Sequence, residues 1–100
     1  MLYAILGHDA PDSLARRLAA RPRHLVRAQQ LHDQGRLVLA GPFPAIDSPD
    51  PGPAGFTGSL IVAEFDSQID AEAWIAADPY VIDGVFARTE VRPFKQVFPQ

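Results

Sequence analysis

The sequence predicts an α+β fold in which an antiparallel sheet carries its helices on one face. Four apolar runs of strand length are bounded by turn-forming residues, and two stretches with helical spacing fall within the order β-α-β-β-α-β. That order is the split-βαβ pattern of a ferredoxin-like fold. One hundred residues, 47% of them apolar, supply one core, so we expect a single domain over 1–100.

The first half of the chain contains the first strand and a helical stretch with a proline inside it. Leu2–His8 is a short apolar run that ends before a turn, as a strand does. Pro22 removes a helical hydrogen bond and clashes with the preceding turn. We therefore expect a broken first helix, made of pieces at 12–19 and 22–34. Gly35 suits the C-cap of the second piece.

The second half supplies three strands, a helix and a long loop. Apolar runs predict strands at 37–40, 56–65 and 86–98, and a helix is expected at 68–77, ended by a proline. The proline-rich segment 43–55 is too polar for a regular element. It is either a functional lid or a variable surface excursion.

Both faces of the central strands are apolar. In the first strand, Tyr3 and Ile5 point away from the face of Leu2, Ala4 and Leu6, yet both sets are apolar. The helices can cover only one face of an antiparallel sheet. A second copy is the economical cover for the other face. We therefore expect a homodimer that packs sheet to sheet.

Charge and composition limit the kinds of partner that this chain is expected to have. Residues 1–40 carry six arginines against three aspartates, whereas 41–100 carry three basic and nine acidic side chains. The arginines lack interleaved aromatics and are read as a solvated helix face, so no nucleic-acid partner is expected. No long apolar run predicts a membrane span, and no signal peptide is visible. The absence of cysteine fits a cytoplasmic protein.

His24 and Asp78 are the candidates for chemistry. His24 lies on or beside the apolar stripe of its helix, where it is either a proton-transfer group or a hydrogen-bonded boundary residue. Asp78 ends a helix before Pro79, and Tyr80 can serve as a core aromatic with its hydroxyl at the rim. A metal site needs convergent ligands that this sequence does not space together, so we expect neither a metal nor another cofactor.

A glycine-rich segment opens the third strand. Gly58 is expected at a bulge or where a ligand or the backbone approaches closely. Thr57 and Ser59 share a strand face and offer hydroxyls, but no GxSxG turn supports a serine nucleophile.

Several short motifs together resemble one known family. They are Arg21-Pro22-Arg23-His24-Leu25, Gly35-Arg36-Leu37, Ala40-Gly41-Pro42, Gly58-Ser59, Asp78-Pro79-Tyr80 and Gly84-Val85. In order and spacing they are similar to the YCII-related (YciI-like) family. The resemblance implies a dimeric α+β barrel of ferredoxin-like subunits and places the family's active-site pair at His24 and Asp78. A few similar proteins carry out lyase-type dehydrochlorination of chlorinated aromatics.

The function expected on this basis is cofactor-free acid–base chemistry, lyase- or hydrolase-like, on a small anionic or phenolic substrate. Asp78 would orient His24, which would move the proton. Arg21 and free amides of a helix start at Pro22 would hold an anion. The expected substrate-binding residues are Arg21, Gly41, Pro42, Phe56, Ser59 and Tyr80. The alternatives are a non-catalytic binding or sensing dimer, and, by analogy of fold alone, a cofactor-free oxygenase.

Overall fold

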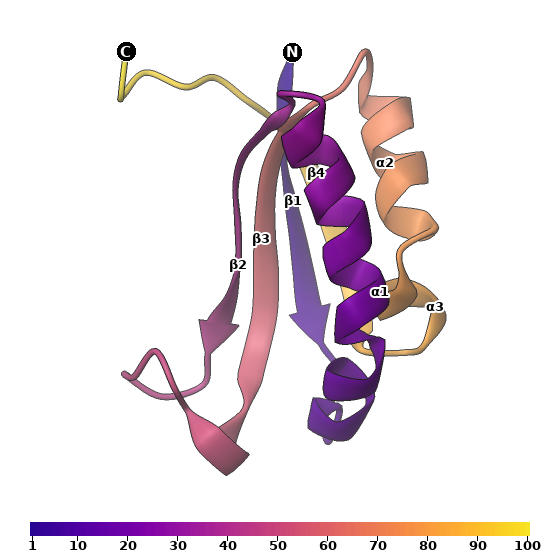
Figure 1. The fold of residues 1–100 in the computed structure, drawn as a ribbon, viewed down its shortest axis with the longest axis vertical. Helices are drawn as coiled ribbons and strands as arrows, with labels where there is room; N and C mark the ends of the chain where they lie inside the picture. Colours follow the sequence, from indigo (N-terminus) through magenta and orange to yellow (C-terminus); the bar gives the residue numbers. More distant parts are fainter.

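A computed structural model describes all 100 residues as a four-stranded antiparallel sheet with its helices on one side (Figure 1). The sheet order is β2-β3-β1-β4, so β1 and β3 are central and β2 and β4 are edges. This is the predicted α+β, ferredoxin-like arrangement. The elements are β1 (Leu2–Asp9), α1 (Leu14–Asp33), β2 (Leu37–Pro44), the 3₁₀ turn η1 (Gly52–Ala54), β3 (Phe56–Glu64), α2 (Gln68–Ala76), α3 (Pro79–Ile82) and β4 (Phe86–Phe94).

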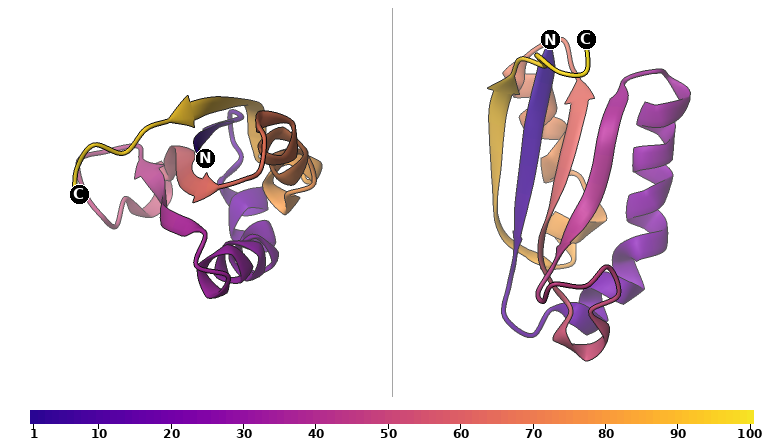
Figure 2. Two further views of the ribbon diagram at one scale, coloured as in Figure 1. Left: turned by 90° about the horizontal axis from the view of Figure 1, so that it is seen from above. Right: turned by 90° about the vertical axis from the view of Figure 1, so that its left-hand side faces the viewer.

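The core lies between the sheet and its helices, which occupy the same side in both further views (Figure 2). Tyr3 and Ile5 of β1 face this layer, as predicted, and pair with Ala63 and Ile61 of β3. Their side chains share a face because side chains alternate along a strand. The inward set is buried almost completely, and each of these four residues is at most 6% exposed.

The first helix is not broken, so the prediction of two pieces was wrong. α1 runs continuously from Leu14 to Asp33 with Pro22 inside it. Pro22 lies on the solvent side of the helix, where water can satisfy the carbonyl that its missing N–H leaves free. The consequence concerns the site. Residues 21–24 are helix interior, so the expected free amides of a helix start are absent beside Arg21.

Other strand and helix boundaries differ from the predicted ones by a few residues. β2 continues through Pro44 at a sheet edge, and β4 ends at Phe94 instead of residue 98. Gly35 follows α1 with a φ of 71°, in the left-handed region that favours glycine, as expected of a C-cap. The chain directly after Asp78 forms the short helix α3.

The sheet face opposite the helices, here called the open face, is apolar over the middle of β1, β2 and β3, whereas β4 adds the charged Glu90 and Arg92 at its edge. It carries Leu6 and Leu60 as a cross-strand pair, with Leu39 and Phe43 of β2 48% and 41% exposed. Gly58 is at a close backbone approach, as predicted, because a Cβ there would collide with the carbonyl oxygen of Gly7. No helix of this fold combines the length and hydropathy that a bilayer crossing requires.

Candidate functional site

His24 and Asp78 are in direct contact. The His24 Nδ1 atom lies 2.8 Å from Asp78 Oδ2, and both side chains are buried. His24 is on the buried side of α1, and Asp78 is the N-cap of α3. These two helices lie side by side (Figure 1). A carboxylate accepts from Nδ1–H, so the neutral ring keeps its lone pair at Nε2. No protein group hydrogen-bonds Nε2, and the ring lines a cavity.

Asp78 is held in place by the start of α3 and by the guanidinium of Arg27. It is the N-cap of that helix, and its Oδ2 also accepts a hydrogen bond from the Tyr80 backbone N–H at 3.0 Å. Arg27 donates to Oδ1 at 2.9 Å and also to the carbonyl of Trp74. Burial acts to raise the pKa of Asp78, but the hydrogen bond and charge of His24, followed by Tyr80 and Arg27, hold it below its ordinary value. Asp78 is therefore ionised at neutral pH.

Tyr80 holds the plane of the His24 imidazole ring in place. Its phenol stacks on the imidazole of His24, with centroids 4.0 Å apart and planes 11° from parallel. On another side it meets the ring of Phe86 edge to face. Burial raises the pKa of Tyr80 above its ordinary value, although the charges of Arg17 and Arg21 act in the opposite direction. The phenol stays neutral at physiological pH.

Arg17 is a functional candidate that the sequence did not reveal. Its guanidinium donates to both carboxylate oxygens of Asp9, at 2.9 and 2.7 Å, and to Ser59 Oγ at 3.1 Å. It also lies over the ring of Tyr80, 4.8 Å from the centroid. Arg17 is 4% exposed, so it does not belong to the solvated face to which the arginines were assigned.

A signal for Arg17 was present in the spacing. The buried positions of α1 are Arg17, Ala20, His24, Ala28 and Leu31, which recur at helical intervals. A charged residue on a buried stripe needs a partner of opposite charge, so the position of Arg17 on this stripe indicates a buried ion pair. Leu25, although apolar and next to His24 in the sequence, lies off this stripe and is 43% exposed.

Most of the predicted substrate-binding residues surround the His24 ring. An inner cavity of about 170 Å³ opens between α1, β2 and β3, and His24, Arg21, Gly41, Pro42, Ser59 and Tyr80 are among its lining residues. Ser59 accepts a hydrogen bond from Arg17, which leaves its hydroxyl proton available to a ligand. Arg21 makes no ion pair, so its positive charge at this cavity is uncompensated.

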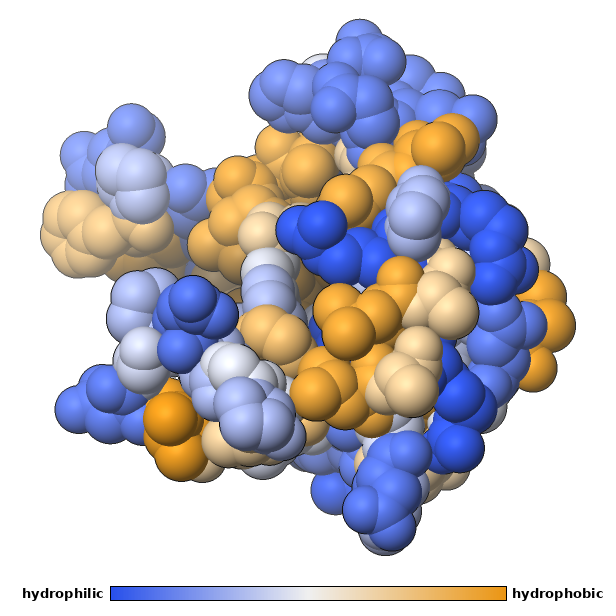
Figure 3. Space-filling view, turned by 60° about the horizontal axis from the view of Figure 1, so that its bottom comes forward, coloured by the Kyte–Doolittle hydropathy of each residue, from blue (hydrophilic) through white to orange (hydrophobic).

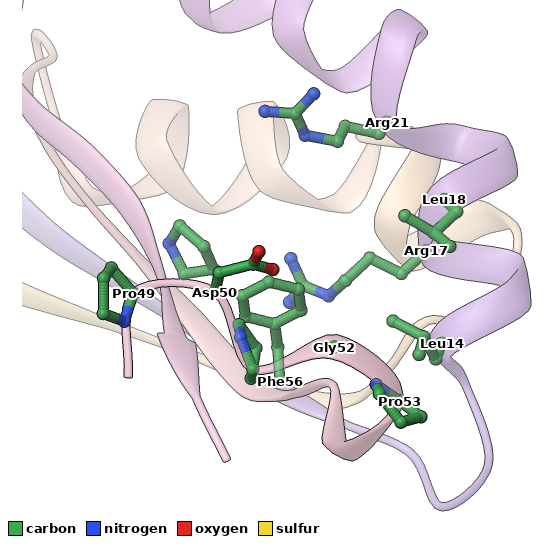
Figure 4. Close-up of a pocket in the computed structure, with 11 residues that line it drawn as sticks. Leu14, Arg17, Leu18, Arg21, Pro49, Asp50, Gly52, Pro53 and Phe56 are labelled. Carbon is green, nitrogen blue, oxygen red and sulfur yellow. The ribbon is translucent and has the colours of Figure 1, made fainter. Parts of the chain in front are cut away.

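Phe56 belongs to a second, outer cavity of about 610 Å³ (Figure 4). This cavity lies between the first turns of α1 and the proline-rich loop, and the surface at this end of the molecule mixes apolar and hydrophilic residues (Figure 3). Asp50 of the loop, and Arg17 and Arg21 of α1, are all among its lining residues. The loop predicted as a lid or a surface excursion therefore forms one wall of a cavity.

The other histidines lie apart from this pair. His8 bonds Glu90 across the strands at 2.8 Å, and together with Arg92 it lowers the pKa of that carboxylate. His32 is exposed near the end of α1. No group of three or more histidine, cysteine or acidic side chains converges anywhere in the chain. What the arrangement offers chemically is one base, Nε2 of His24, beside one free cation.

A model of the YCII-related domain matches residues 1–95. The chain belongs to the YCII-related family. Over 98 residues it is 59% identical to Protein YciI of Escherichia coli O6:H1, covering 98% of this chain and all of that one. It is 50% identical to an uncharacterized protein of Haemophilus influenzae over the same length.

Among solved structures, the chain resembles 5-chloro-2-hydroxyhydroquinone dehydrochlorinase (TftG) of Burkholderia phenoliruptrix AC1100, in complex with 2,5-dihydroxybenzoquinone. The TM-score is 0.82 at 27% identity, over 95% of this chain and 94% of that chain. A protein of this fold thus binds 2,5-dihydroxybenzoquinone.

Proposed function

We propose that this YCII-related protein is an enzyme that binds a small anionic or phenolic molecule in the inner cavity and transfers a proton with His24. One observation carries the proposal. The His24 Nδ1 atom is held 2.8 Å from a fully buried, ionised Asp78, while Nε2 has no protein partner beside a cavity. No buried side-chain nitrogen or oxygen lacks a hydrogen-bond partner in this structure, so Nε2 is open to the cavity and can meet a bound molecule there.

The proton-transfer step follows from this geometry. Nε2 takes a proton from an acidic O–H or C–H of the bound molecule, and an imidazolium forms. The Asp78 carboxylate stabilises that cation, and the electron pair left on the substrate faces the charge of Arg21. General acid–base catalysis of this kind typically raises the reaction rate about 10²–10⁴-fold.

The substrate class is supported by two observations. The charge of Arg21 is uncompensated and suits a phenolate or carboxylate. The structural relative acts on a chlorinated hydroquinone by dehydrochlorination and was captured with a dihydroxybenzoquinone. A lyase-type reaction on a small hydroxylated ring is therefore the first candidate for this chain, and a hydrolase-like reaction is the second.

We also propose that the chain works as a homodimer joined through the open face. The support is the exposed apolar set on β2 and the half-buried Leu6 and Leu60 beside it. An antiparallel sheet that faced water would carry polar residues there.

The test is a panel of chlorinated and hydroxylated hydroquinones, with turnover followed by absorbance and chloride release. Wild type should convert at least one member, and His24→Ala should lose at least a hundredfold in kcat while remaining folded, although it should melt at a lower temperature because it loses the contacts with Asp78 and Tyr80. His32→Ala is the matched control, because His32 is an exposed residue of the same helix, and it should be unaffected.

Two outcomes would contradict the enzyme proposal. Undiminished turnover by His24→Ala would remove His24 from the mechanism. Binding of panel members by wild type without any conversion would favour the alternative of a non-catalytic ligand-binding or sensing dimer.

A further inference from the structure

The inner and outer cavities adjoin. They share three lining residues, Arg17, Arg21 and Pro42, so a single ligand can extend from one cavity into the other. The inner cavity, at about 170 Å³, has room for little beyond one small ring, whereas the outer one measures about 610 Å³. A molecule that filled only the inner cavity would leave most of the available volume unused.

The outer cavity has an apolar wall on each side. Leu14 and Leu18 of α1 face it from the helix, and Phe56 faces it from the start of β3 (Figure 4). Walls of this kind favour the burial of alkyl or aryl groups. Leu18 is 58% exposed, which is surface that such a group would cover.

The wall of the outer cavity that lies across from α1 is stiff. It is the proline-rich loop, in which Pro49, Pro51 and Pro53 each fix a backbone angle. The Ala45 N–H donates to the carbonyl of Gly55 at 2.9 Å and closes the loop. A preformed wall costs a ligand less ordering entropy than a flexible one does.

The two cavities differ in charge. Arg21 stands at their junction without an ion pair, and the charge of Arg17 is balanced by Asp9. Asp50 lines the outer cavity from the loop, and its carboxylate makes no ion pair. The site is therefore positive toward His24 and negative at its outer wall.

We propose that the substrate is larger than a single ring: an anionic head sits at Arg21 and His24, and an uncharged apolar substituent occupies the outer cavity. Asp50 is the specificity-determining residue there, because it repels substituents that end in an anion. The assignment of the head rests on the proposed function. The assignment of the tail rests on the outer cavity alone.

Three probes that share one ring test this. They are 2,5-dihydroxybenzoquinone, its 3-butyl derivative and its 3-(3-carboxypropyl) derivative, with Kd measured by calorimetry on the full chain. A buried methylene is worth about a threefold to fourfold change in Kd, so the partly buried butyl group should tighten binding at least tenfold. The carboxypropyl derivative should bind no tighter than the unsubstituted ring.

Substitution of the loop carboxylate isolates its role. Asp50→Asn should tighten binding of the carboxypropyl derivative about threefold to tenfold and leave the unsubstituted ring within twofold. Asp47→Asn is the matched control, since Asp47 is an exposed carboxylate of the same loop that does not line the cavity. It should change none of the three affinities.

The outcomes separate the two proposals. If the unsubstituted ring binds in a His24-dependent way and the butyl group adds nothing, the outer cavity is not a subsite and only this inference falls. If the carboxypropyl derivative binds as tightly as the butyl one to wild type, Asp50 does not select. If the ring itself does not bind, the proposed function fails and this inference fails with it.

Discussion

The rings of His24 and Tyr80 lie face to face, 4.0 Å between centroids and 11° from parallel. They come from α1 and α3, which meet beside the sheet. The same turn that brings the phenol against the imidazole also points the Tyr80 backbone N–H at Asp78 Oδ2. One short helix therefore supplies both the carboxylate that binds Nδ1 and the surface that fixes the plane of the ring.

The stack predicts a difference between two substitutions of Tyr80. Tyr80→Phe keeps the ring and should change the free energy of unfolding by less than about 1 kcal/mol, whereas Tyr80→Leu should cost about 2 kcal/mol or more, because the aromatic pair and buried volume are lost. Urea unfolding measures both. For turnover, kcat should fall only in the leucine variant. An equal fall in both variants would assign the role to the hydroxyl instead of the stack.

Asp78 predicts an acid dependence of stability. Its pKa is lowered in the folded protein from an ordinary value of 3.8, so its stabilising contribution is complete above that value and is lost as pH falls through the lower folded pKa. Wild type should lose stability below about pH 4 through this group.

Asp78→Asn should be less stable at pH 7 and show a shallower loss toward acid, as measured by urea unfolding at a series of pH values. Parallel curves for the two proteins would mean that Asp78 does not contribute to the acid limb.

The pair of Arg17 and Asp9 predicts strong coupling. Both side chains are only 4% exposed, so Arg17→Met leaves a buried carboxylate without its cation and should cost about 3–5 kcal/mol. Adding Asp9→Asn should recover part of that loss. A double-mutant cycle in urea measures the coupling energy. Additive single effects would show that the two groups do not depend on each other.

Gly58 predicts a packing penalty. Gly58→Ala places a Cβ against the Gly7 carbonyl oxygen and should destabilise the fold by about 1–3 kcal/mol, because the two central strands must separate. Gly41→Ala is the matched control, since a Cβ there meets nothing within 4 Å. Thermal unfolding of both variants measures the difference. Equal melting temperatures would contradict the close approach.

The open face predicts the assembly state. Leu60→Glu places a charge in the centre of this face and should shift a dimer toward monomer in sedimentation velocity at micromolar concentration. Ile69→Glu is the control, because Ile69 is 76% exposed on α2, away from the sheet. It should leave the assembly unchanged. A wild-type chain that sediments as a monomer would overturn the homodimer proposal itself.

Local patterns sufficed for the element order and for some single residues. Gly35 and Gly58 were assigned from what only glycine tolerates, and both assignments were confirmed. Pro22 led to the wrong prediction of a broken first helix, because proline also has a strong local preference for the start of a helix. The outcome depended on which side of α1 faced water, which the local pattern did not reveal.

By itself, the sequence determined the alternation of strands and helices, because hydrophobic period and chain-breaking residues act over a few positions. Spacing left His24 and Asp78 as candidates, and the resemblance to the YCII-related family paired them. Only the tertiary structure decided which charges are paired. Arg17 is a site residue because β1 ends with Asp9 beneath it, and Arg21 is free because no carboxylate, not even Asp50 in the same cavity, comes within ion-pair distance of it. Electrostatic pairing acts between segments far apart in the chain, so a local pattern can mark a buried charge such as Arg17 but cannot identify its partner.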